Sequence, residues 1–176
     1  LFSRGIKYSY IYELNIHPQA TVDSIGMNYY FTLLNQDYSP KPALNSLKNL
    51  HQLFVDDNLS LPEKNLTYRL TGPDTLRHVV FQRSDNSYLL VLWNEVDSRV
   101  NYLPQNSLIT FNQSTMDIES YDIVHSSNIV AQEKSVGQVQ IAVGDSPIVL
   151  HLKPSSDSVS GANTFNSPKS SLLTPN

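Results

Sequence analysis

Apolar residues recur at every second position after residue 66, and this period constrains the fold more than any other feature of the chain. Leu66, Tyr68 and Leu70 alternate with polar neighbours, and residues 78–83 and 88–94 flank a turn cluster at 84–87. Alternation of this kind predicts β-strands, and two such runs joined by polar turn residues predict a hairpin. Further strands are expected at residues 99–103, 107–112, 119–124, 128–132, 138–143 and 147–153.

Many short strands with turn residues between them are typical of an antiparallel β-sandwich, which we expect over residues 62–153. The most continuously apolar run, 88–93, is expected to be the central strand. Trp93 ends this run. We interpret it as a core residue rather than a platform for a sugar ring, because a Trp at the end of an apolar strand is usually packed inside. Ile148, Leu150 and Leu152 should form the inward face of the last strand.

The first 58 residues follow a different pattern. Tyr8, Tyr10 and Tyr12 alternate with Ser9 and Ile11, which predicts a strand. Both faces of this strand are mostly apolar. Such a composition suits a parallel strand covered on two sides better than a half-solvated antiparallel strand.

A helix is expected after residue 37. Ser39 is the candidate N-cap, and Pro40 fits the first helical position, where its missing N–H costs nothing. From Ala43 to Val55, apolar residues recur at three- and four-residue spacing, which predicts an amphipathic helix with one buried face. Pro62 forbids its continuation.

The same residues resemble the end of the (β/α)8 barrel in secreted glycoside hydrolases of clan A. The resemblance is carried by Tyr12-Glu-Leu14, Phe31-Thr-Leu-Leu34, Asp37, Ser39-Pro-Lys-Pro-Ala43 and Leu47-Lys-Asn-Leu50. It implies that residues 1–58 are the final β-strand and α-helix of such a barrel. Members of this group often continue into a C-terminal antiparallel β-sandwich. Thr32 stands where the family usually has Gly, so the loop before the helix is expected to run differently here.

The resemblance also implies where a substrate would bind. In the resembling enzymes, both catalytic carboxyl groups come from the fourth and seventh strands, and neither strand is expected in this chain. We therefore assign no catalytic residue and expect no catalysis by the chain alone. Glu13 would lie on the catalytic face of the barrel. With Tyr10, Tyr12 and Asn15 it forms the expected substrate-binding set, unless Glu13 merely solvates a strand end.

Composition excludes several other classes of function. A net charge of −4, with 16% charged residues, gives no basic surface for nucleic acid. No apolar run is long enough to span a bilayer, and neither a signal peptide nor a membrane anchor is expected. The chain has no Cys, and its five His residues lack metal-ligand spacing. No metal and no cofactor are therefore expected.

Residues 154–176 are rich in Ser, Asn, Pro and Thr and are expected to form a disordered tail or linker. The whole sequence is interpreted as the C-terminal portion of a secreted glycoside hydrolase, whose sandwich supports the catalytic barrel. Its partners would be the N-terminal part of that barrel and, through the complete enzyme, a carbohydrate. The alternative is a free-standing β-sandwich that binds carbohydrate or another protein, with the first 55 residues as an extension.

Overall fold

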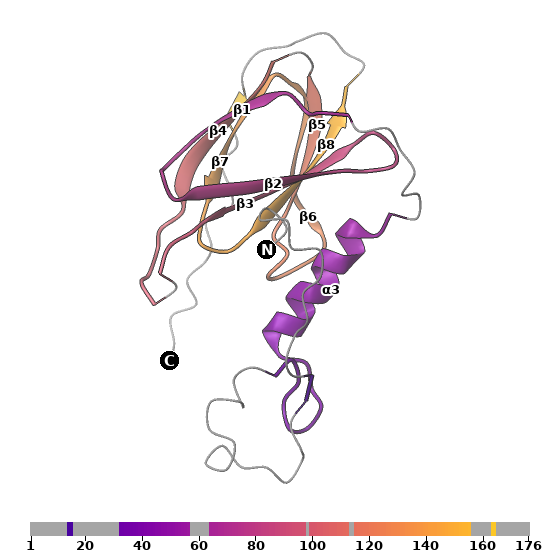
Figure 1. The fold of residues 1–176 in the computed structure, drawn as a ribbon, viewed down its shortest axis with the longest axis vertical. Coiled ribbons are helices and arrows are strands. Elements are labelled where there is room, and N and C mark those ends of the chain that lie inside the picture. The colour runs from indigo at the N-terminus through magenta and orange to yellow at the C-terminus, as the bar shows by residue number, and fades with distance from the viewer. Residues whose placement is uncertain are drawn as a thin grey trace.

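The computed structural model describes residues 14–15, 32–56, 64–97, 99–112, 115–155 and 163–164. Within these ranges it contains one helix, followed by strands that occupy most of the remaining described residues (Figure 1). The helix is α3 (Pro42–Phe54). The strands are β1 (Tyr68–Thr71), β2 (Leu76–Gln82), β3 (Tyr88–Asn94), β4 (Gln105–Phe111), β5 (Met116–Tyr121), β6 (Ile129–Val136), β7 (Gln138–Val143), β8 (Ile148–Pro154) and β9 (Asn163–Thr164).

The strands form two sheets. The four-stranded sheet has the order β1-β4-β7-β9, and the five-stranded sheet has the order β2-β3-β8-β5-β6. All pairs are antiparallel except β7 with β9, which is parallel. The expectation of a mainly β fold built from antiparallel sheets is thus confirmed, and the arrangement is consistent with a β-sandwich. The expected barrel strand over residues 8–14 lies outside the described residues, apart from Leu14.

The main core lies between the two sheets. Leu90 of β3 and Leu150 of β8 are register partners on the inner face of the five-stranded sheet, and both are almost fully buried. They belong to one cluster with Ile109 of β4 and Ile141 of β7, which come from the other sheet. Each buried Leu or Ile stabilises the fold by ~1.5–3 kcal/mol relative to an exposed one. This cluster also contains Leu152, and Ile148 packs against it, so the inward face expected for the strand that is now β8 is confirmed.

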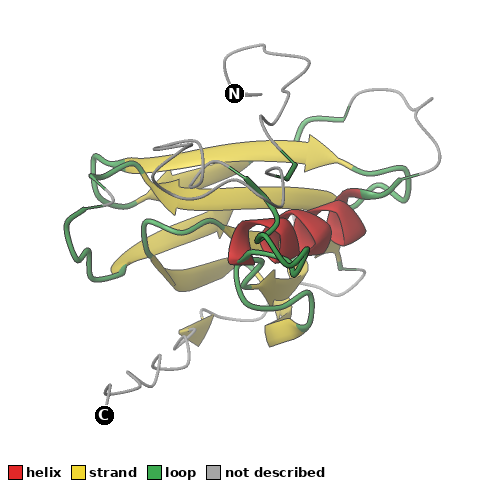
Figure 2. Cartoon of the chain, turned by 90° about the horizontal axis from the view of Figure 1, so that it is seen from below, coloured by secondary structure: helices red, strands yellow, loops and turns green. Residues whose placement is uncertain are grey.

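The strand β3 is buried on both of its faces. Leu90 and Leu92 point into the main core, whereas Leu89 and Val91 belong to a second cluster that includes residues of α3. Figure 2 shows α3 lying against the strands. This cover on two sides explains why residues 88–93 form an unbroken apolar run. The run is an interior strand, but β8 rather than β3 occupies the middle of the sheet.

Two local predictions were wrong. Residues 99–103 form no strand, because the Asp97 side chain instead accepts hydrogen bonds from the backbone N–H and guanidinium of Arg99 in a turn. The helix begins two residues later than expected, with Lys41 at the N-cap and Pro42 in the first turn. Ser39 does not cap it; its hydroxyl donates to Asp37 Oδ1 at 2.6 Å.

The observed strands 88–94 and 138–143 match their expected bounds, and the hairpin at 84–87 joins β2 to β3 as predicted. Within the expected tail, Asn163–Thr164 pair with β7. β8 also extends to Pro154, and Ser155 donates its backbone N–H to Thr115. The rest of the tail lies outside the described residues.

Candidate functional site

Of the four expected substrate-binding residues, the structure places one. Tyr10, Tyr12 and Glu13 lie outside the described residues. Asn15 is half-buried, and its Oδ1 is a buried acceptor with no hydrogen-bond partner in the described part of the chain. The preceding carbonyl, that of Leu14, accepts the backbone N–H of Leu34 at 3.1 Å. Asn15 therefore lies beside the segment that leads into α3.

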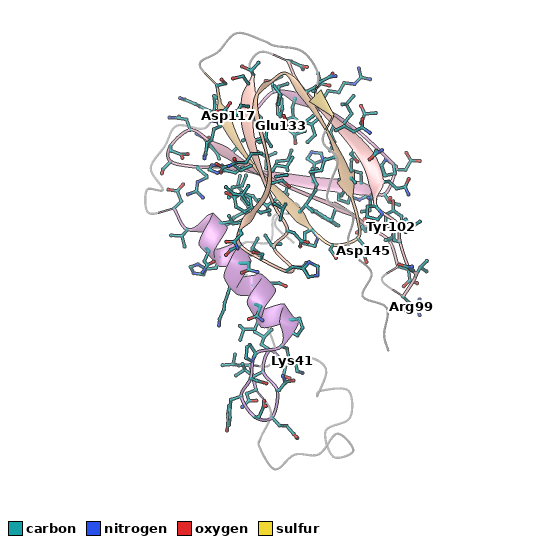
Figure 3. All side chains as sticks on the ribbon, turned by 180° about the vertical axis from the view of Figure 1, so that it is seen from behind. Lys41, Arg99, Tyr102, Asp117, Glu133 and Asp145 are labelled. Atoms are coloured by element: carbon teal, nitrogen blue, oxygen red, sulfur yellow. The ribbon has the colours of Figure 1, made fainter. Side chains whose placement is uncertain are left out.

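Thr32, at the position where the resembling family usually has Gly, is buried and fixed by two contacts. Its hydroxyl donates to the carbonyl of Leu34 at 2.9 Å and accepts from Lys41 Nζ at 2.6 Å. Lys41 is the Lys of the Pro-Lys-Pro segment, and it lies at the start of α3, away from Asp117 and Glu133 (Figure 3). The ammonium group thus joins the helix N-terminus to the preceding loop, and Thr32 supplies an oxygen that Gly could not.

α3 lies on the outer face of the five-stranded sheet. Leu50, Leu53 and Phe54, at helical spacing, pack against Leu89, Val91, Tyr121, Ile123 and Val149. The Phe54 ring meets Phe81 of β2 edge-on, with the ring centroids 4.9 Å apart. The apolar stripe predicted from the sequence is therefore used to hold the helix to the sandwich.

Polar contacts also fix the helix. Just past its middle, the Asn49 side-chain amide donates to the carbonyl of Ile123 at 2.9 Å. At its end, the Arg83 guanidinium donates to the carbonyls of Leu53 and Val55 at 2.5 and 3.1 Å. The last carbonyls of a helix have no partner within the helix and carry partial negative charge, so a cation there satisfies and stabilises them. α3 is thus held in one position on the sheet.

An apolar groove of about 790 Å³ runs between α3 and the sheet. Its walls are Leu47, Leu50, His51, Phe54 and Val55 from the helix end, and Val79, Phe81, Val91, Trp93, Ile123 and Pro147 from the sandwich. Val55 remains 46% exposed at its edge. Trp93 belongs to the second cluster and is half-buried, so it packs on the outer face rather than in the main core. The groove is an apolar surface that could receive further protein.

A row of polar side chains crosses the same face of the sheet beyond the groove. Ser87 Oγ lies 2.7 Å from His151 Nε2, and His151 Nδ1 lies 3.2 Å from Glu119 Oε2. Glu119 also accepts from Lys153 Nζ at 2.8 Å and from the Tyr121 hydroxyl at 3.0 Å. Partial burial alone would raise the pKa of Glu119, but the bonds from Lys153 and Tyr121 outweigh it and lower the pKa. Burial and the neighbouring Glu119 raise the pKa of Tyr121 to about 12.

The order Ser, His, Glu is that of a nucleophile, a base and an orienting carboxylate, but the geometry does not support nucleophilic catalysis. Ser87 is only 2% exposed, and its hydroxyl also donates to Asp85 Oδ1 at 2.5 Å. A serine that is covered and bonded to a carboxylate cannot reach a substrate. The row therefore ties the turn before β3 to β8 and β5.

The sequence did not reveal this row. His151 and Glu119 are direct register partners in neighbouring strands, although 32 positions separate them in the chain. Only the pairing of β5 with β8 brings them together. A polar residue at an outward position of each strand was a weak signal, and it gave no indication of the partner.

No group of three or more metal-binding side chains lies close enough together to hold an ion in the described ranges. The helix that the structure describes is too short and polar to cross a membrane. A scan against models of protein families and a search of curated proteins found no match to this chain.

Proposed function

We propose that this chain is the C-terminal portion of a glycoside hydrolase, in which the β-sandwich supports a catalytic (β/α)8 barrel. α3 would be the last helix of that barrel, and the strand before it would carry Tyr10, Tyr12, Glu13 and Asn15 to the sugar-binding face. The complete enzyme would act on carbohydrate outside the cell.

The observation that supports this proposal most is the docking of α3. The helix that the Pro-Lys-Pro segment opens is held on the sandwich by its apolar face and by Arg83, so both parts form one unit. A module that supports a barrel needs a fixed joint of this kind. The neighbouring groove offers the apolar area on which other barrel elements would rest.

Val55 and Val100 provide a matched pair of variants to test this role. Both are exposed Val residues, at 46% and 61%, but only Val55 lies at the groove. Val55→Asp should hardly change the melting temperature of this chain, because water still reaches the carboxylate. In the complete enzyme the carboxylate would be buried against the barrel without a partner, and the thermal inactivation temperature of glycosidase activity should fall clearly.

Val100→Asp is the control and should be neutral in both proteins. Equal effects of the two substitutions in the complete enzyme would contradict the supporting role. A complete protein without glycosidase activity would contradict the assignment to this class of enzyme. The chain alone should hydrolyse neither aryl glycosides nor polysaccharides, because both catalytic carboxylates would lie in the earlier part of the barrel.

A further inference from the structure

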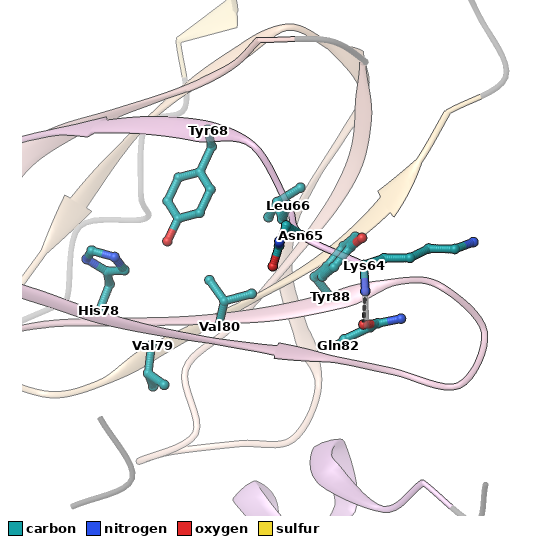
Figure 4. Close-up of a pocket in the computed structure, with 9 residues that line it drawn as sticks. All are labelled: Lys64, Asn65, Leu66, Tyr68, His78, Val79, Val80, Gln82 and Tyr88. Atoms are coloured by element: carbon teal, nitrogen blue, oxygen red, sulfur yellow. Dashed lines mark hydrogen bonds between the residues drawn. The ribbon is translucent and has the colours of Figure 1, made fainter. Parts of the chain in front are cut away.

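A second hollow lies on the other side of β2, between the open edges of the two sheets. β1 is the edge strand of the four-stranded sheet and β2 is the edge strand of the five-stranded sheet. The cleft between them has a volume of about 440 Å³, within the ~300–1,000 Å³ range of small-ligand sites. Tyr68 descends into it from β1, and His78 and Val80 rise into it from β2 (Figure 4).

Two aromatic rings form a corner of the cleft. The rings of Tyr68 and His78 stand at 78° to each other, with their centroids 5.8 Å apart. Partial burial raises the pKa of Tyr68 and lowers the pKa of His78, so both rings are uncharged at neutral pH. Neutral rings with a polar edge can contact the apolar C–H face of a sugar and bond its hydroxyls at the same time.

The cleft also contains polar side chains that form no hydrogen bond within the described part of the protein. In the described part of the chain, the side chains of Asn65, Tyr68 and His78 make no hydrogen bond. Asn65 and His78 are exposed. Together they present an amide, a phenol and an imidazole, each able to donate or accept. A ligand with many hydroxyl groups would match this set.

The charges of the lining residues restrict the chemical class of the ligand further. Among the described residues that line the cleft there is no carboxylate, so these residues offer no ligand set for a divalent cation. Among the described lining residues the cationic one is Lys64, which donates through Nζ to Asn86 Oδ1 at 2.7 Å. Figure 4 shows its ammonium group turned away from the cleft. The remaining lining is neutral and polar, with Leu66 and Val80 as apolar contacts.

We propose that the cleft between β1 and β2 binds a neutral pyranose carbohydrate, with Tyr68 and His78 as ring contacts and Asn65 as a hydrogen-bonding residue. Support of a barrel requires no such site, so this proposal goes beyond the function proposed above and does not depend on it. The sandwich would hold a sugar chain at a second place, separate from Glu13 and its neighbours.

The test is a titration of the 176-residue chain, followed by NMR of its backbone amides. The probes are four neutral tetrasaccharides, of cellulose, xylan, mannan and amylose type, and one charged tetragalacturonate. At least one neutral probe should shift the amides of β1 and β2 around the cleft at millimolar concentration. Each of three variants should weaken the affinity for that probe about fivefold, which corresponds to the ~1 kcal/mol of one hydrogen bond. The variants are Asn65→Ala, Tyr68→Phe and His78→Ala.

Arg69→Ala is the matched control, because Arg69 is an exposed neighbour of Tyr68 whose side chain points to the opposite face of β1. It should leave the affinity unchanged. Tyr68→Phe keeps the ring and its packing, so its effect reports on the hydroxyl rather than on folding. The proposal is overturned if no neutral probe shifts these amides, if only tetragalacturonate binds, or if Arg69→Ala weakens binding as much as the cleft variants.

Discussion

Phe54→Ala tests whether α3 is held to the sandwich by its apolar face. The Phe54 ring is half-buried in the second cluster and meets Phe81 at 4.9 Å. Replacement of a fully buried Phe by Ala costs ~3–5 kcal/mol, so about half of that, ~2 kcal/mol, is expected here. A loss of ~2 kcal/mol corresponds to a roughly 30-fold increase in the equilibrium constant for detachment of the helix.

Native-state hydrogen exchange measures this constant directly, because the amides of α3 exchange when the helix detaches. In Phe54→Ala they should exchange roughly 30-fold faster, by the same conversion, and the amides of β3 and β8 should accelerate by no more than this factor. Lys48→Ala, at an exposed position of the same helix, is the control and should change little. Unchanged exchange of α3 in Phe54→Ala, or an equal effect of Lys48→Ala, would refute the role of the apolar face.

Three further substitutions probe the sandwich. Leu90→Ala, at a fully buried position, should lower the free energy of unfolding by ~2–5 kcal/mol in urea titrations, whereas Leu103→Ala, at a position 70% exposed, should not; similar midpoints would contradict the assigned core. Asn94→Ala removes the hydrogen bond from Nδ2 to the carbonyl of Val143 at 2.7 Å and should lower the free energy of unfolding by ~1–3 kcal/mol in the same assay. Asn106→Ala, at an exposed position, is the control. Equal stability of the two variants would show that the hydrogen bond is not needed. Burial lowers the pKa of His151 below its ordinary 6.5, so on acidification the unfolded chain binds a proton there before the folded chain does. The free energy of unfolding should therefore fall as the pH drops below 6.5, and it should fall less steeply in His151→Gln. Superimposable pH profiles of the two proteins would count against this coupling.

Local sequence patterns predicted the elements well where both local chemistry and packing favoured the same structure. The helix over Pro42–Phe54 and the strand over Tyr88–Asn94 carry strong periodic signals, and tertiary contacts reinforce both. Val100 and Leu103 carried a strand-like signal without such support, and both are exposed in a loop. The Asp97 turn decided that segment, because a short carboxylate side chain competes with strand pairing for backbone N–H groups.

The candidate sites were harder to predict, since they depend on which strands become neighbours. Tyr68 and His78 lie on the edges of different sheets, and Glu119 meets His151 only through the pairing of β5 with β8. Periodicity fixes which face of a strand a residue occupies, but it does not identify the strand beside it. The docking of α3 did leave a signal in the sequence, because the outward residues of β3, Leu89 and Val91, are apolar and pack against the helix.

The central proposal, that this chain is the C-terminal portion of a glycoside hydrolase, can be tested by covalent labelling of the native protein, because the clan A enzymes that the sequence resembles retain the configuration of the sugar. A fluorinated glycoside traps the glycosyl-enzyme intermediate of such enzymes on its nucleophile. Peptide mapping should then find the label on a carboxylate that precedes Leu1 in the same polypeptide. No label with any glycoside of a broad panel, or a label on a carboxylate within residues 1–176, would contradict the account.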